Sequence, residues 1–194
     1  MLSEPEIIER KKELRRELKE KISVVPNREL ISKSPEIIAN LASILKGWEA
    51  QAIALYKKIG FEPDIFPVVD LLPEPKICLP VLLQKNTPMI FREYKPGDVL
   101  EPGSLYNKVL QPSPAKPEII PDIVILPLLG FDETGARLGR GGGYYDRTLA
   151  HLRVHKTILA IGIGLGIQKI PQIPKGRHDE KMDFIVTESN IYKF

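Results

Sequence analysis

The run 137–146 constrains what this chain can fold into more than any other part of the sequence. It reads Arg-Leu-Gly-Arg-Gly-Gly-Gly-Tyr-Tyr-Asp and holds four glycines, two arginines and two tyrosines. Residues 123–129 before it are apolar and indicate a buried strand, and residues 145–152 indicate a helix. A glycine-rich turn between strand and helix lets backbone N–H groups approach an anion at the positive end of the helix dipole. The sequence therefore predicts a loop that binds phosphate.

A second interpretation of these glycines stays open. A tight turn from strand to helix also needs glycine wherever φ is positive, with no ligand involved. Three consecutive glycines between Arg140 and a tyrosine pair favour the phosphate interpretation, because arginine adds bidentate phosphate donors. The run is not a known short nucleotide motif. It lacks the Lys-Ser/Thr ending of a P-loop, and Tyr144 occupies the sixth position of a GxGxxG pattern.

The rest of the chain alternates between apolar runs and helical patterns. We expect strands at residues 50–56, 77–83, 89–94, 122–129, 157–164 and 184–187, and helices at 3–22, near 27, from 34, at 64–72 and at 145–152. Continuous apolar strands separated by helices are typical of a parallel sheet covered on both faces.

This pattern predicts an α/β fold. We expect a three-layer α/β/α sandwich with a largely parallel mixed sheet, formed by a single domain over residues 1–194. Residues 89–94 should pair with 77–83 as a hairpin, and the proline-rich residues 96–121 should form a long irregular connection. Ligands of such folds bind outside the carboxyl ends of the strands, where the glycine loop would lie.

The first helix carries two cations in an unexpected place. With about 100° of rotation per residue, Lys11 and Arg15 fall inside the apolar sector of the helix. Ile7, Leu14 and Leu18 define that sector. One interpretation is snorkelling, in which the aliphatic stems are buried and the charges reach the rim. The other is that both cations point inward to an anionic ligand. The sequence alone does not choose between them.

Carboxylates near the glycine loop and in a later polar loop are candidate metal ligands. Asp146 opens the helix after the glycine loop, and Asp179 lies in the polar run 178–183. A magnesium ion that bridges nucleotide phosphates takes one or two protein carboxylates and keeps several waters. Either residue could equally be a helix cap or a loop acceptor. Glu62, after the first strand, could face the pocket or be a solvated loop acid.

Composition and charge exclude several classes of protein. The net charge of +3 is small and acids are interleaved with bases, which disfavours a nucleic-acid surface. The single cysteine, Cys78, excludes an intrachain disulfide and lies in an apolar run, so we expect it in the core. No zinc pattern such as CxxC or HExxH occurs. Without a secretory signal or an apolar run of ~20 residues, we expect a soluble cytoplasmic protein with no membrane partner.

The glycine run is also part of a longer pattern at residues 126–146. There an apolar strand is followed by GFD, RLGRG, one variable residue and GYYD. This pattern resembles the 5-formyltetrahydrofolate cyclo-ligase family, also called methenyltetrahydrofolate synthetase. Lys-Lys-Glu-Leu-Arg at 11–15 looks like the basic helix motif of that family. His178 and Asp179, with Asp183, resemble its C-terminal element.

The resemblance implies an ATP-dependent ligase. Such enzymes cyclise 5-formyltetrahydrofolate to 5,10-methenyltetrahydrofolate and convert ATP to ADP and phosphate with Mg2+. The formyl oxygen attacks the γ-phosphoryl group and gives an iminium phosphate, the position-10 amine closes the ring, and phosphate leaves. The partners would then be small molecules, ATP and the folate substrate, and we expect a monomer.

The resemblance also assigns roles to residues. It implies catalysis by Lys11, Arg140 and Tyr144, and a magnesium ion shared by Asp146 and Asp179. Substrate contacts would fall on Lys57, where the family has an apolar residue, on Glu62, which would contact the pterin, and on Arg140, Gly142 and Tyr144. ATP would contact Lys11, Lys12, Glu13, Leu14, Arg15, Arg137, Leu138, Gly139, Arg140, Gly141, Gly142, Gly143, Tyr144 and Tyr145.

Two other functions fit parts of the sequence. A non-catalytic module that binds a nucleotide or another polyanion would use the same arginines and glycines, but it would need neither a metal nor Glu62. An RNA-associated protein would use the basic first helix. The glutamates interleaved along that helix would repel a phosphate backbone: Glu6, Glu9, Glu13, Glu17 and Glu20. We therefore expect no nucleic-acid partner.

Overall fold

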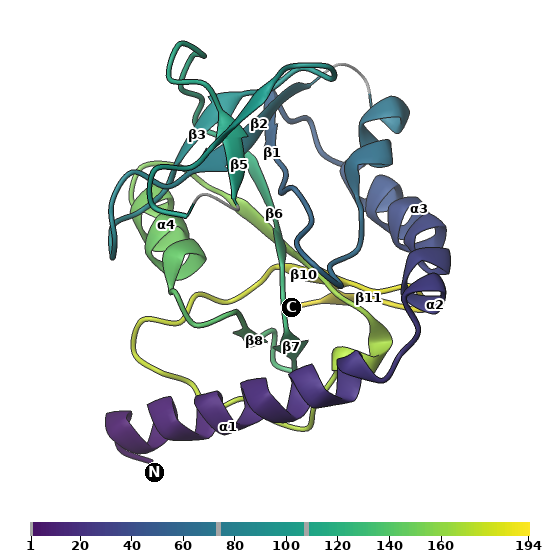
Figure 1. The fold of residues 1–194 in the computed structure, drawn as a ribbon, viewed down its shortest axis with the longest axis vertical. Coiled ribbons are helices and arrows are strands. Elements are labelled where there is room, and N and C mark those ends of the chain that lie inside the picture. The colour runs from purple at the N-terminus through teal and green to yellow at the C-terminus, as the bar shows by residue number, and fades with distance from the viewer. Residues whose placement is uncertain (1, 73–74, 107–108) are drawn as a thin grey trace.

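The computed structural model describes residues 2–72, 75–106 and 109–194. Helices of two kinds occur in these residues (Figure 1). The α-helices are α1 (Glu4–Ser23), α2 (Asn27–Ser32), α3 (Ser34–Leu45) and α4 (Tyr144–Arg153), and the short 3-10 helices are η1 (Phe66–Leu71) and η2 (Gly166–Gln168).

Seven strands of the described residues form the central sheet. Across the sheet they follow the order β11 (Ile191–Lys193), β10 (Phe184–Val186), β9 (Leu159–Ile163), β6 (Ile123–Pro127), β1 (Ala52–Ala54), β2 (Lys76–Val81) and β3 (Ile90–Glu93). The five inner strands are parallel, while β3 pairs antiparallel with β2 and β11 pairs antiparallel with β10. The predicted largely parallel mixed sheet is confirmed, as is the hairpin of β2 and β3.

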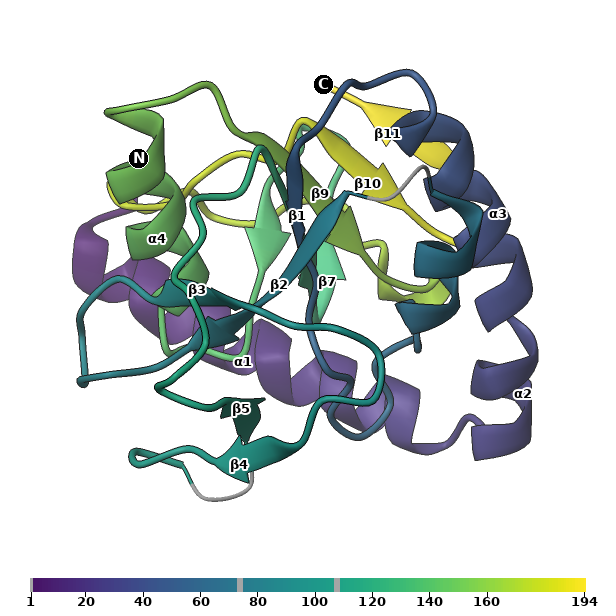
Figure 2. The ribbon, with the colours of Figure 1, turned by 90° about the horizontal axis from the view of Figure 1, so that it is seen from above.

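Helices lie on both faces of this sheet (Figure 2). In β6, Ile123 and Ile125 belong to the apolar cluster that contains α1 and α3, whereas Val124 and Leu126 belong to the cluster that contains Leu149 of α4. Successive side chains of a strand point to opposite faces, so a strand buried on both sides reads as a continuous apolar run. The three-layer α/β/α arrangement is confirmed in this way.

The strand order reverses between β1 and β6. From β1 the chain moves to its neighbour β2, and from β6 it moves the other way, to β9 and then β10. Where connections leave a sheet in opposite directions, a crevice opens at the carboxyl ends of the strands. The loop after β1 starts at this crevice, and the chain that leads from β6 to the glycine loop starts there too.

Helix α1 crosses the carboxyl edge of the sheet beside the short strand that follows β6 (Figure 1). It begins where the capping box predicts, with the Glu6 carboxylate accepting the Ser3 N–H at 2.7 Å. Its buried Leu18 packs closely on β7 (Gly130–Phe131): a Cβ on Gly130 would lie 2.5 Å from Leu18 Cδ1. This packing fixes where the polar residues of α1 lie relative to the crevice.

Two small ribbons occur where the sequence predicted irregular chain. Within residues 96–121, β4 (Leu100–Pro102) pairs antiparallel with β5 (Leu110–Pro112), so the prediction of an irregular connection was wrong. Residues 107–108 of that segment lie outside the described residues. Between β6 and the glycine loop, β7 pairs antiparallel with β8 (Arg137–Leu138). Strands of two or three residues are too short to show an apolar alternation, so the pattern does not reveal them.

Two expectations drawn from composition have a structural counterpart. Cys78 is buried in β2, and burial raises the pKa of its thiol to about 12. The thiol therefore stays protonated and unreactive near neutral pH. Among the helices of the described residues, none combines the length and the apolar character that a bilayer crossing requires.

Gly130→Ala should disturb the packing of α1. The added methyl group would collide with the buried Leu18, and overpacking of this kind costs about 1–3 kcal/mol of the free energy of unfolding. Leu18→Ala leaves a cavity and costs about 2–5 kcal/mol. In the double variant, the shortened side chain at position 18 makes room for the methyl group at position 130. Urea unfolding should then give a total smaller than the sum of the single costs. Strict additivity would show that the two positions do not share space.

Candidate functional site

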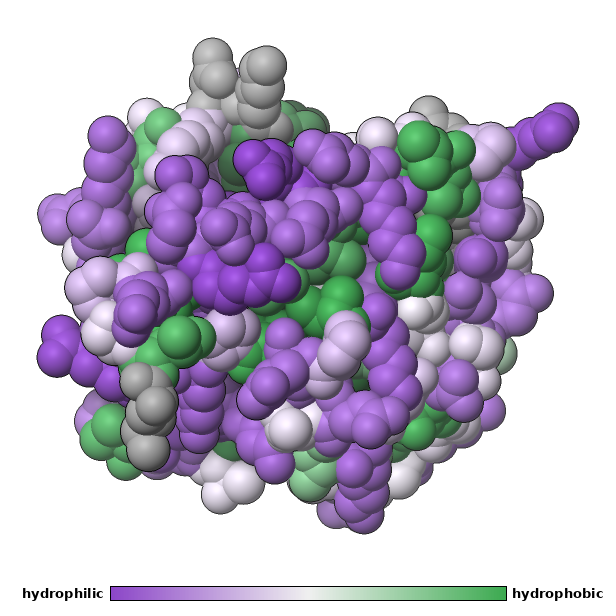
Figure 3. All heavy atoms as spheres, turned by 90° about the horizontal axis from the view of Figure 1, so that it is seen from below, coloured by the Kyte–Doolittle hydropathy of each residue, from purple (hydrophilic) through white to green (hydrophobic). Residues whose placement is uncertain are grey.

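A cavity of about 1140 Å³ opens at the carboxyl edge of the sheet. Its wall is built from α1, the loop after β1, the end of β2, the β4–β5 ribbon, the glycine loop with the start of α4, and residues near 178. Seen from below in the orientation of Figure 1, hydrophobic surface shows between hydrophilic side chains (Figure 3). Segments that are far apart in the sequence therefore meet where the strand order reverses.

The glycine loop joins β8 to α4 and lines the cavity. Gly141 and Gly143 have positive φ angles of 104° and 65°, and Gly143 is the N-cap of α4. A Cβ on Gly142 would lie 2.9 Å from the ring of Tyr144, so space explains this glycine. The turn interpretation therefore accounts for part of the loop. Because no side chain caps α4, its first N–H groups remain available to an anion.

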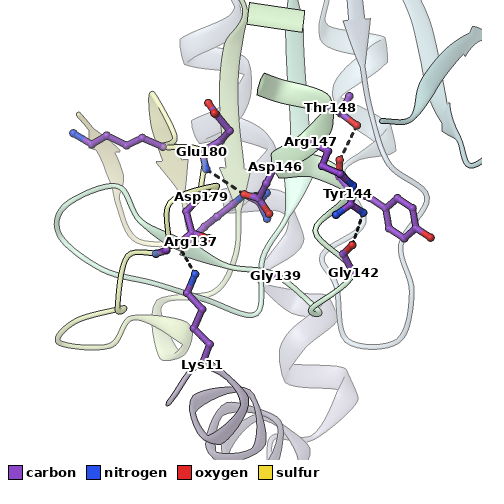
Figure 4. A network of polar contacts seen from close by, with 12 residues as sticks. Lys11, Arg137, Gly139, Gly142, Tyr144, Asp146, Arg147, Thr148, Asp179 and Glu180 are labelled. Atoms are coloured by element: carbon purple, nitrogen blue, oxygen red, sulfur yellow. Dashed lines mark hydrogen bonds and ion pairs between the residues drawn. The ribbon is translucent and has the colours of Figure 1, made fainter. Parts of the chain in front are cut away.

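Helix α1 supplies a second positively charged wall. Lys11 is buried, with 8% of its surface exposed, and its ammonium group binds the carboxylate of Asp179 (Figure 4). Arg15 donates from Nε to the carbonyl oxygen of Gly139 at 2.9 Å. A Cβ on Gly141 would lie 3.5 Å from the Arg15 guanidinium. Both cations thus point to the protein interior around the glycine loop, and snorkelling does not describe them.

Asp146 and Asp179, the candidate metal ligands, each hold a cation. Arg137 donates from Nη2 to Oδ1 of Asp146 at 2.8 Å, and the N–H of Glu180 reaches the same oxygen at 3.2 Å. Asp179 uses its Oδ2 for Lys11. Within the described residues, Oδ2 of Asp146 and Oδ1 of Asp179 have no hydrogen-bond partner. Each carboxylate therefore keeps one oxygen for another ligand.

These two carboxylates fit a magnesium ion better than a metal held by the protein alone. The N–H of Glu180, the residue after Asp179, donates to Asp146, which brings the two carboxylates to the same part of the cavity wall. No group of three or more His, Cys, Asp or Glu side chains suited to a metal occurs in the part of the chain that the structure describes. Mg2+ commonly takes one or two carboxylates and completes its shell with waters and substrate phosphates. The two carboxylates, each with one oxygen free of hydrogen bonds in the described residues, match this mode of coordination.

Glu62 is buried rather than solvated, and it connects the loop after β1 to the glycine loop. Its Oε1 accepts a hydrogen bond from Nε of Arg140 at 2.9 Å, and its Oε2 accepts one from the N–H of Ile59 at 2.8 Å. Nη2 of Arg140 lies 2.8 Å from the same Oε1 in the ion pair and donates to the carbonyl oxygen of Ile59 at 2.8 Å. Burial raises the pKa of Glu62, although the Arg140 guanidinium and the Ile59 N–H oppose the rise. The Arg140 side chain is 48% exposed, so it remains accessible from the cavity.

The wall that follows β1 and β2 is largely apolar. Lys57 is a cation within it, with Nζ 3.5 Å from the centroid of the Phe66 ring and 3.4 Å from the hydroxyl oxygen of Tyr94. Apolar side chains form much of this wall: Leu79, Pro80, Leu82, Leu100, Val109 and Leu110. A cavity with a charged end and an apolar end suits a substrate that has the same two parts.

Three residues of the basic helix motif lie outside the cavity lining. Lys12 is exposed and pairs with Glu9 at 3.3 Å. Glu13 binds Arg10 at 2.9 Å, and Leu14 is buried in the core. The motif therefore reaches the cavity through Lys11 and Arg15, one turn apart. The other residues expected to contact ATP do line the cavity: Arg137, Leu138, Gly139, Arg140, Gly141, Gly142, Gly143, Tyr144 and Tyr145.

Arg147 lines the cavity without having been predicted. It donates from Nη2 to the carbonyl oxygen of Gly142 at 2.6 Å, and its guanidinium lies 5.1 Å from the centroid of the Tyr144 ring. Its place one helical turn after Gly143 is the signal that could have revealed it. The hydroxyl oxygen of Tyr106, next to the β4–β5 ribbon, lies 3.3 Å from that of Tyr144.

Comparison with known proteins gives a consistent result. The model of the 5-formyltetrahydrofolate cyclo-ligase family matches residues 7–188. A relative from Mycolicibacterium smegmatis, named 5-formyltetrahydrofolate cyclo-ligase, is 30% identical over 161 residues, which cover 75% of this chain and 81% of the relative. A relative of the same name from Escherichia coli K12 is 30% identical over 152 residues, with 75% and 82% covered.

Solved structures have the same fold. The 5,10-methenyltetrahydrofolate synthetase of Aquifex aeolicus aligns with a TM-score of 0.77 and 28% identity, over 94% of this chain and 92% of that chain. A 5,10-methenyltetrahydrofolate synthetase of Mycoplasma pneumoniae aligns with a TM-score of 0.70 and 25% identity, over 92% and 98%.

The titration of Glu62 should make stability fall as pH rises. A carboxyl group whose pKa is higher in the folded protein holds more protons when folded, so the free energy of unfolding decreases as pH rises above the ordinary pKa of 4.5. Glu62→Gln removes this titration. We expect the stability of the variant, relative to the wild type, to increase from pH ~4 towards neutral pH in urea unfolding.

Subtraction of the wild-type curve removes the opposite slope of Asp98, Asp122 and Glu188, whose pKa values are lowered. Glu49→Gln, at an exposed position, is the matched control. A stability difference for Glu62→Gln that does not change with pH would contradict the assignment.

Proposed function

The chain belongs to the 5-formyltetrahydrofolate cyclo-ligase family, and we propose how its cavity performs the reaction of that family. The enzyme is an ATP-dependent ligase that closes 5-formyltetrahydrofolate to 5,10-methenyltetrahydrofolate. One observation supports the way in which we assign the two substrates to the two walls of the cavity. Arg140 of the glycine loop and Glu62 of the loop after β1 hold each other between the charged and the apolar walls of the cavity.

We assign the triphosphate of ATP to the glycine loop and α1. The start of α4 offers N–H groups and the positive end of a helix dipole, with Lys11 and Arg15 beside it. Arg137 lines the cavity with only 7% of its surface exposed, and its Nε has no partner within the described residues. A buried donor of this kind needs an acceptor, and a phosphate oxygen supplies one.

We assign a magnesium ion to the free oxygens of Asp146 and Asp179. Bound with the nucleotide, Mg2+ would neutralise negative charge on the β- and γ-phosphates. The protein contributes the two carboxylates and keeps them oriented through Arg137 and Lys11. If the ammonium group of Lys11 then left the Asp179 carboxylate, it could bind a phosphate oxygen.

We assign the folate to the apolar wall, with its pterin beside Glu62. A carboxylate can accept N–H donors on both of its oxygens, as Glu62 does with Nε of Arg140 and the N–H of Ile59. Adjacent N–H groups of a pterin ring are two donors that a carboxylate can accept together, in place of such contacts. Gly142 and Tyr144 lie where the two substrates would meet.

The reaction then consists of two steps, a phosphoryl transfer and a ring closure. The formyl oxygen attacks the γ-phosphorus of ATP while the bond to the bridging oxygen breaks, and ADP leaves. The position-10 nitrogen attacks the carbon of the resulting iminium phosphate and loses its proton, and phosphate leaves. Arg140 and the N–H groups of the glycine loop stabilise the charge on the transferred oxygens. Lys11 and Arg15 hold the leaving phosphates.

A non-catalytic module that binds polyanions is the weaker candidate. The relatives that match most of the chain are named as ligases. The apolar wall beside Glu62 would also have no use in such a module. A monomeric state, a cytoplasmic location, the absence of a nucleic-acid partner and a single domain over residues 1–194 stay predictions.

Purified protein supplied with Mg-ATP and 5-formyltetrahydrofolate should form the methenyl product. Product formation is followed by the growth of its near-ultraviolet absorbance. Omission of ATP, or chelation of the metal with EDTA, should abolish the signal, and added Mg2+ should restore it. Turnover that survives chelation would remove the assigned role of Asp146 and Asp179, and no product under complete conditions would overturn the function.

Arg140→Ala should lower kcat by about 10²–10³-fold, the effect of losing one preorganised donor to a developing negative charge. Arg16→Ala, at an exposed position of α1 outside the cavity lining, is the matched control. Because Arg140 also pairs with the buried Glu62, thermal unfolding is measured alongside turnover. Near-normal kcat in a folded variant would exclude Arg140 from the phosphoryl transfer.

A further inference from the structure

Lys57 is a cation in the apolar part of the cavity. It follows β1, and its side chain is partly buried against two aromatic residues that belong to the core. Nζ lies 3.5 Å from the centroid of the Phe66 ring and 4.8 Å from that of the Tyr94 ring. A ring face attracts a cation but offers no lone pair, so these contacts hold the ammonium group in place without satisfying its N–H donors.

The ammonium group of Lys57 is not neutralised by the protein. Within the described residues it forms no salt bridge with a carboxylate. Its one hydrogen bond within those residues is long, 3.4 Å to the hydroxyl of Tyr94. An ammonium group has three donors, so at least two remain for a ligand or for water.

The cations at the other end of the cavity differ in this respect. Lys11, Arg137 and Arg140 each pair with a carboxylate, and Arg15 donates to a backbone carbonyl. Those cations surround the glycine loop, whereas Lys57 packs on η1 and on the residue after β3, with the exposed Lys58 next to it in the cavity lining. The cavity therefore has two separate positive regions, and the triphosphate of ATP accounts for one of them.

We propose that Lys57 binds the glutamate carboxylate of the folate substrate and sets the preference of this enzyme for folates that carry one. This inference rests on the proposed function. With the pterin at Glu62 and the formyl group at Arg140, the remaining part of the substrate is its aminobenzoyl ring and its glutamate. The ring is apolar, like the wall that surrounds Lys57, and the glutamate carries the anion that Lys57 lacks.

A comparison of two substrates tests this assignment. 5-Formyltetrahydropteroate has the pterin, the formyl group and the aminobenzoyl ring of 5-formyltetrahydrofolate but lacks the glutamate. The wild type should prefer the folate in kcat/KM. In Lys57→Met, which keeps the apolar stem and removes the charge, this preference should fall about 10-fold, the size expected for one charge-assisted hydrogen bond. The change should lie in KM for the folate, since the contact is remote from the transferred phosphoryl group.

Two further variants control for structure and for general charge. Lys57→Arg keeps the cation and should retain most of the preference. Lys46→Met removes the charge of an exposed lysine outside the cavity lining and should leave the preference unchanged. Turnover of the pteroate by Lys57→Met also reports that the variant is folded and that its reaction centre is intact.

The outcomes are distinct. An equal loss on both substrates would assign Lys57 to the pterin and overturn the proposal, and no change on either substrate would make Lys57 a structural residue. A wild type that does not discriminate between the substrates would overturn it too. A wild type that turns over neither substrate would instead contradict the proposed function itself.

Discussion

Pairing of opposite charges between distant segments holds the carboxyl edge of this sheet together. Lys11 of α1 pairs with Asp179, more than 160 residues further along the chain. Arg140 pairs in the same way with Glu62. Pairs of this kind add little net stability, because desolvation of both charges offsets their attraction. They contribute position instead, since each one fixes two segments that no strand pairing connects.

The same pairs explain how so many cations can converge in one cavity. At least five basic side chains line the cavity around the glycine loop, and like charges that lie close together repel one another: Lys11, Arg15, Arg137, Arg140 and Arg147. Carboxylates distributed among them reduce the repulsion: Glu62, Asp146 and Asp179. A nucleotide that brings several negative charges can compete for these cations, because it exchanges one charged partner for another rather than filling an empty positive site. The pairing therefore preserves the site without preventing its use.

The sequence predicts which residues form this site better than it predicts which residues they contact. The glycine loop could be recognised because its residues are contiguous and follow a buried strand. The position of Lys11 and Arg15 on the apolar face of α1 was visible as well, but periodicity could not separate snorkelling from inward cations. That distinction depends on what the two side chains contact, and the pairing of Lys11 with Asp179 and the hydrogen bond from Arg15 to the carbonyl of Gly139 decide it. The burial of Glu62 was open for the same reason. The β4–β5 and β7–β8 ribbons were missed because their strands are too short for a pattern.

The reversal of strand order explains why the site needs so few long-range contacts to bring two substrates together. The loop after β1 carries Lys57 and Glu62, and the chain after β6 carries Arg140. Because β1 and β6 are hydrogen-bonded neighbours, these two connections leave the sheet only about 5 Å apart. One turns toward β2 and the apolar wall, and the other turns toward α4 and the phosphate-binding loop. In the arrangement that we propose, the reacting ends of the folate and the nucleotide meet at the point where the connections diverge, and their remote ends extend along opposite walls.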